Sequence, residues 1–147
     1  MPAQITRLNK LTDRKPERRS DMRMIEQEII QAIRDRKSFS TSYTQDMYRK
    51  KEGRRDVLVW NEEYPGIFSL KLWGHQIAKG DTISRTLEIS DCGYPTATTK
   101  SRLNAVFAAL DIPMSCSVRN KKMVYFYKVK EISEKEVETS DYVISIS

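Results

Sequence analysis

The feature that most limits how this chain can fold is a regular alternation of apolar and polar residues in its middle. In residues 67–73, Phe68, Leu70 and Leu72 alternate with polar side chains, which is the period-two pattern of a half-buried β-strand. A glycine turn follows, and apolar residues recur at even spacing through residues 83–89. The sequence therefore predicts an antiparallel meander of three or four strands.

Two segments with helical spacing flank this meander. The first begins at Ser20 or Asp21, which both favour the N-cap position, and runs to about Lys37. The second begins at Thr98 or Thr99 and ends before a proline. Each carries apolar residues at spacings of three and four, so we expect each to pack one face onto the sheet.

Further strands are predicted on both sides of these elements. MVYFYKV, ending at Val129, is apolar on both faces, so we expect this strand to be central or packed under a helix. The acidic segment 130–141 is expected to form a short helix, and YVISIS a terminal edge strand. The predicted fold is α+β: an antiparallel sheet of about five to six strands with two packed helices and a basic N-terminal arm.

Positive charge is concentrated at the front of the chain. Residues 1–56 hold 15 Lys and Arg against 9 Asp and Glu, whereas residues 57–147 hold 11 of each. Residues 1–19 contain too few apolar side chains to fold alone, so we expect a basic arm before a single domain at 20–147. A neutral body with a basic front attracts polyanions, which makes nucleic acid the expected partner. The arm residues expected to contact phosphates are Arg14, Lys15, Arg18 and Arg19.

A second basic segment ends the polar stretch 38–55, which we expect to form a loop. Its aromatic residues could stack on bases or pin the loop to the body. The charges also fit a solvated face that only keeps the protein soluble, and this alternative stays open. The loop residues expected to contact phosphates are Arg49, Lys50, Lys51, Arg54 and Arg55.

The most distinctive segment is GYPTATTKSRLNA, residues 93–105. A threonine cap at Thr98 or Thr99 would leave first-turn N–H groups open to an anion, beside two cations. Asn104 follows Lys100 by four residues on the same helix face, so a phosphate and a neighbouring base or sugar could be contacted together. The nucleic-acid-binding set predicted here is Tyr94, Thr98, Thr99, Lys100, Arg102 and Asn104.

A structural interpretation of the same segment also stays open. In it the threonines cap the helix, and Arg102 pairs with an acid such as Asp91. Asn104 then satisfies a nearby backbone group. A protein-binding face is a further alternative.

The segment GYPTATTKSRLNA resembles the hallmark of a family of small phage and prophage proteins. In that hallmark a Gly-aromatic pair and a Ser/Thr-rich turn precede Thr-Thr-Lys-x-Arg-Leu-Asn. The resemblance covers residues 67–110, and it departs at His75, where the family prefers asparagine. It implies a phage origin and a strand–strand–helix core, and it implies no particular function.

The sequence carries no catalytic, cofactor or metal motif. Its single histidine, His75, has no cysteine or acid pair nearby, and no phosphate-loop, dinucleotide or zinc-protease motif occurs. We therefore expect neither an enzyme nor a bound cofactor or metal. Cys92 and Cys116 are expected to be reduced thiols, and the lack of a long apolar run predicts a cytoplasmic protein without a membrane partner.

These observations lead to one main hypothesis and two alternatives. The main one is a phage-encoded accessory protein that binds DNA or RNA through phosphate contacts, with an affinity that falls as salt rises. The first alternative is a host-directed protein inhibitor, acting on a defence nuclease or on polymerase. The second is a virion-associated structural protein whose arm holds a neighbouring subunit.

Overall fold

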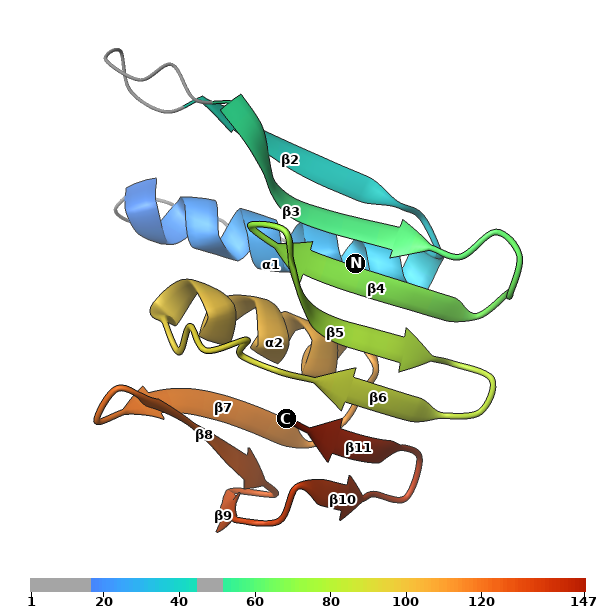
Figure 1. Ribbon diagram of the computed structural model, residues 1–147, viewed down its shortest axis with the longest axis vertical. Helices are drawn as coiled ribbons and strands as arrows, with labels where there is room; N and C mark the ends of the chain where they lie inside the picture. Colours follow the sequence, from blue (N-terminus) through green and yellow to red (C-terminus); the bar gives the residue numbers. More distant parts are fainter. Residues whose placement is uncertain (1–16, 45–51) are drawn as a thin grey trace, which may run out of the picture.

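The computed structural model describes the backbone of residues 17–44 and 52–147 and the side chains of residues 24–41 and 55–147. In this part of the chain, two helices lie on one face of a seven-stranded sheet, and a three-stranded sheet lies next to the second helix (Figure 1). The elements are α1 (Glu17–Asp35), β2 (Phe39–Thr44), β3 (Glu52–Trp60), β4 (Ile67–Leu72), β5 (His75–Asp81), β6 (Thr86–Ile89), α2 (Ala97–Ala109), β7 (Met114–Arg119), β8 (Lys122–Tyr127), β9 (Lys130–Ile132), β10 (Glu136–Glu138) and β11 (Val143–Ile146).

The predicted meander is confirmed as the centre of the larger sheet. Strands β3 to β6 pair in chain order and antiparallel. Phe68, Leu70 and Leu72 are buried, as their alternation predicts. The register between β4 and β5 shifts after Leu70, and both Ile77 and Ala78 are buried beside this irregularity.

The α+β class and the two helices are confirmed, but the predicted strand count and the all-antiparallel pairing are wrong. The larger sheet has the order β10-β11-β6-β5-β4-β3-β2, and β11 pairs parallel to β6 instead of lying at an edge. Residues 39–44, expected in a loop, form β2, and the helix expected over 130–141 is replaced by β9 and β10. Strands β2, β9 and β10 are short and polar and are held by backbone pairing with their neighbours. Their sequences therefore lack the apolar alternation from which a strand is predicted.

The two helices run parallel and are tied together at their C-terminal ends. Arg34 of α1 donates to the carbonyl oxygen of Ala108 (3.1 Å) and pairs with Asp111 (3.3 Å), so a cation sits at the negative end of α2. Helix α1 begins at Glu17, before the predicted Ser20 or Asp21, so residues 17–19, predicted in the basic arm, belong to the helix instead.

The three-stranded sheet has the order β7-β8-β9, so β8 is central, as predicted. Tyr125 of β8 is buried. Val129, predicted on a covered face, is instead 93% exposed, because it lies in a two-residue turn with positive φ between Tyr127 and Lys130.

Candidate functional site

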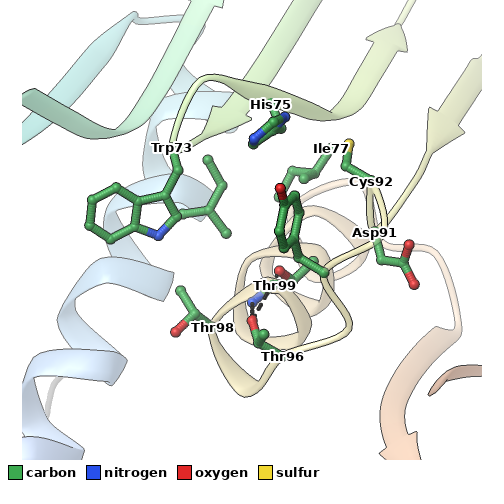
Figure 2. Close-up of a pocket in the computed structure, with 10 residues that line it drawn as sticks. Trp73, His75, Ile77, Asp91, Cys92, Thr96, Thr98 and Thr99 are labelled. Atoms are coloured by element: carbon green, nitrogen blue, oxygen red, sulfur yellow. Dashed lines mark hydrogen bonds between the residues drawn. The ribbon is translucent and has the colours of Figure 1, made fainter. Parts of the chain in front are cut away.

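A pocket of about 460 Å³ opens where the β4–β5 turn, the β6–α2 connection and the first turn of α2 meet. We call it the Trp73 pocket. Figure 2 shows Trp73 and Cys92 on opposite sides of it, with Thr98 at the α2 end. Its lining residues are Leu72, Trp73, His75, Ile77, Asp91, Cys92, Tyr94, Thr96, Thr98 and Thr99.

Three ring-bearing side chains surround this pocket. Trp73 is 46% exposed and Tyr94 is 55% exposed. The rings of His75 and Tyr94 lie 5.1 Å apart between centroids, with an interplanar angle of 42°. Leu72 and Ile77 are buried, so the pocket has an apolar floor below partly exposed rings.

Trp73 owes its position to a tight hairpin turn. Leu72 and His75 are paired across the β4–β5 hairpin, and the two residues between them, Trp73 and Gly74, both have positive φ (54° and 85°). Two-residue hairpins of this kind need left-handed residues, and they favour asparagine or glycine. The Trp73 N–H donates to the carbonyl oxygen of Arg55 at 2.8 Å, which ties the turn to β3.

The α2 end of the pocket differs from the prediction. The N-cap is Thr96, and neither Thr98 nor Thr99 has that role, because the Thr96 hydroxyl accepts from the Thr99 N–H at 3.2 Å. The Thr99 side chain is buried and lies 3.2 Å from the Thr96 hydroxyl. Thr98 is partly exposed and, like Thr96 and Thr99, lines the pocket.

Arg102 cannot join the predicted phosphate contact, because it is buried in an ion pair. Its side chain donates to both carboxylate oxygens of Asp56, from Nε at 2.7 Å and from Nη2 at 3.3 Å. Arg102 is 3% exposed and Asp56 is fully buried. The structural interpretation of this arginine is therefore the correct one, with Asp56 as the partner in place of Asp91.

Asp56 is the centre of a polar network that joins the sheet to α2. Besides Arg102, it accepts from Arg55 Nε (2.8 Å) and from the Thr41 hydroxyl (2.9 Å). Burial alone would raise the pKa of Asp56, but the hydrogen bonds from Arg102 and Arg55 outweigh it and hold the pKa below its ordinary value. Arg55, predicted in a basic loop to contact phosphates, is therefore a strand residue that shares this carboxylate.

Asn104 and Lys100 lie on the face of α2 that turns towards β7. The Asn104 side chain satisfies both backbone groups of Cys116, at 2.9 Å to its N–H and 3.2 Å to its carbonyl oxygen. The backbone carbonyl of Lys100 accepts from the thiol of the same cysteine at 3.8 Å. Asn104 is therefore a structural residue as well, and Lys100 does not line the Trp73 pocket.

The side chains of the remaining predicted cations lie outside the described part of the chain, so they are not placed relative to the Trp73 pocket. Arg14, Lys15, Arg49, Lys50 and Lys51 lie outside the described residues. Arg18 and Arg19 belong to α1 and Arg54 to β3, but their side chains lie outside the described part.

Of the predicted motif, the pocket therefore brings together Tyr94, Thr98 and Thr99, and it adds Trp73 and His75. The sequence assigned no binding role to His75 or to Trp73. The signal that could have found Trp73 is the Trp-Gly pair in a turn position where asparagine or glycine is usual.

Two kinds of feature are absent from the described residues. They contain no group of three or more His, Cys, Asp and Glu side chains that could hold a metal ion. None of the helices among them is long and apolar enough to cross a membrane.

Comparison with known proteins places the chain in a family. No curated protein and no solved structure matches it. The family model described as Kyanoviridae Gp96 protein matches residues 22–145, a span that runs from α1 into β11. This is a phage protein family, so the predicted phage character is confirmed. The chain belongs to the Kyanoviridae Gp96 protein family.

Proposed function

We propose that this phage protein is a non-catalytic accessory protein that binds single-stranded nucleic acid at the Trp73 pocket. The single observation that carries the proposal is the gathering of three rings, from Trp73, His75 and Tyr94, around an open pocket. Aromatic side chains recognise single strands because every unpaired base offers a π-face for stacking. Bases inside a duplex are already stacked and cannot reach such rings.

The charge distribution supports the proposal by supplying long-range attraction. Residues 1–56 carry the chain's excess of Lys and Arg over Asp and Glu. Four of these cations are Arg14, Lys15, Arg18 and Arg19. Arg102 is excluded from this role and Arg55 shares a buried carboxylate. We therefore assign the attraction to Arg14 and Lys15, to Arg18 and Arg19 at the start of α1, and to Arg49, Lys50, Lys51 and Arg54. Binding through such contacts releases counterions and weakens with salt.

Fluorescence anisotropy with labelled single-stranded and duplex DNA and RNA of equal length tests the proposal. We expect single strands to bind more tightly than duplexes of the same sequence. If four phosphates are contacted, affinity for a single strand should fall about 50-fold between about 50 and 200 mM salt. Failure to bind single strands at the lower salt, or equal affinity for duplexes, would contradict the proposal.

A pair of matched variants separates the effect of the N-terminal cations on binding from the effect of the protein's net charge. One replaces Arg14, Lys15, Arg18 and Arg19 by glutamine. The other replaces four exposed cations of the body by glutamine: Lys121, Lys122, Lys130 and Lys135. Both lose the same charge, and we expect only the arm variant to lower the salt slope, by about 3 for four lost contacts.

The host-directed inhibitor and the virion component stay predictions. A pull-down from host lysate with and without nuclease separates them from the proposed role. A partner that survives nuclease would favour the inhibitor, and detection of the protein in purified virions would favour the structural role.

A further inference from the structure

We infer that the Trp73 pocket holds one unstacked nucleobase through stacking on Trp73, without reading the edge of the base. The inference rests on the proposed function and names the chemical group that its site recognises. The same group could come from a nucleic-acid strand or from a free mononucleotide.

The first argument is the placement of an indole at this turn. A left-handed conformation is unfavourable for residues with a Cβ, and asparagine tolerates it better than tryptophan because its short polar side chain can bond locally. Two other two-residue turns among the described residues have left-handed residues: Asn120-Lys121 between β7 and β8, and Lys128-Val129 between β8 and β9. Trp73 differs from these residues because its large aromatic side chain lines a pocket and is nearly half exposed there. Such a side chain is suited to contact a ligand.

The second argument is the charge of the lining. Among the described residues that line the pocket, Asp91 is the only Asp, Glu, Lys or Arg. A lone carboxylate repels a phosphate, so the group that enters the pocket should be uncharged. A nucleobase is neutral and planar, and its faces match an apolar floor and a ring wall.

The third argument concerns selectivity. Arginine, asparagine and glutamine are the side chains that read base edges in pairs of hydrogen bonds. The described lining has none of them; its Asp91 and its threonine hydroxyls can make single hydrogen bonds to an edge but no such pair. The pocket should therefore accept all bases and prefer purines, which stack over a larger area. Its volume of about 460 Å³ lies within the range of ordinary small-ligand pockets.

The fluorescence of Trp73 reports directly on this pocket. The protein has two tryptophans, and Trp60→Phe leaves Trp73 as the only one, whose emission can be excited separately from that of the tyrosines. Two ten-nucleotide probes carry the same phosphates: an adenine strand and an abasic strand that lacks bases. We expect the adenine strand to change the Trp73 emission and the abasic strand to leave it unchanged.

Variants test the contact itself. Trp73→Asn removes the ring while keeping a residue that the turn favours, so the hairpin should still fold, as a thermal melt would verify. We expect this variant to weaken binding of the adenine strand by about 5- to 150-fold, with partial rescue in Trp73→Phe. Tyr64→Ala is the control, because Tyr64 is also exposed (59%) but does not line the pocket. It should bind like the parent protein.

The outcomes separate this inference from the proposed function. If both strands bind equally and the Trp73 emission does not change, the base pocket is overturned; the protein then still binds single strands, as the proposed function says, but at another site. If no strand binds but adenosine monophosphate changes the Trp73 emission, the pocket is a mononucleotide site and the proposed function fails. If neither strand nor mononucleotide binds, both are overturned.

Discussion

Replacing Asp56 by alanine would leave two arginines without the carboxylate that they share. Asp56 is fully buried and accepts four side-chain hydrogen bonds, two from Arg102 and one each from Arg55 and Thr41. The Arg102 side chain is itself nearly inaccessible, so water cannot replace the lost partner. The variant therefore buries an uncompensated positive charge between α2 and the sheet.

The expected cost of Asp56→Ala follows from that burial. Breaking a buried ion pair by removing one partner typically costs about 3–5 kcal/mol. In a protein of this size 1 kcal/mol corresponds to about 2–4 °C in Tm, so we expect Tm to fall by about 6–20 °C. Arg102→Met should cost less, about 1–3 kcal/mol, because Asp56 keeps Arg55 and Thr41. The double variant Asp56→Leu with Arg102→Met should lose less than the sum of the single changes.

Urea denaturation followed by circular dichroism measures these differences. Glu131→Ala is the matched control, because Glu131 pairs with Arg119 at 3.8 Å on the surface, and exposed pairs contribute about 0–1 kcal/mol. The reasoning is refuted if Asp56→Ala is no more destabilising than Glu131→Ala. A phosphate role for Arg102 would show differently, as lost nucleic-acid affinity in Arg102→Met with unchanged stability.

Three further predictions concern stability. The pKa of Asp56 is lower when folded than its ordinary value of 3.8, so its stabilising contribution is present above that pH and is lost as the pH falls towards the folded pKa; Asp56→Asn should flatten this part of the acid-unfolding curve. Thr96→Ala should cost about 1 kcal/mol in urea denaturation, whereas Thr98→Ala should cost far less, and the reverse order would restore the cap first predicted. Gly80→Ala should destabilise by about 1–3 kcal/mol, because a Cβ there would lie 2.5 Å from the Phe68 ring; an unchanged urea midpoint would contradict this packing.

The sequence predicts the elements whose apolar pattern is local and strong. The alternation at Phe68, Leu70 and Leu72 repeats over a whole strand, and each helix spans several turns, so tertiary contacts reinforce the pattern. The outer strands escape prediction for the opposite reason. Strand β10 buries a single residue, Val137, so its sequence shows no alternation. The strand at β11 was predicted from YVISIS, but its parallel pairing was not, because its partner β6 lies more than fifty residues upstream.

Only some residues of the candidate site could be predicted from the sequence. The segment around Tyr94 and Thr98 stands out by composition, and the structure places both residues at the pocket. The prediction for Arg102 was wrong because an arginine in a helix is usually exposed. Its partner Asp56 lies 46 residues upstream on another element, so the sequence does not show that the two side chains are paired. The importance of Trp73 depends on a hairpin register that brings the β4–β5 turn to the start of α2, and no local pattern encodes that meeting.

The most direct test of the proposed binding site is a heteronuclear NMR titration of the 15N-labelled protein with a short adenine strand. Our account predicts that the largest shifts fall on the indole N–H of Trp73 and on backbone amides from Trp73 to His75 and from Asp91 to Thr99. Amides of the β7-β8-β9 sheet should shift least. Shifts confined to that sheet, or none at the lower salt, would contradict the account.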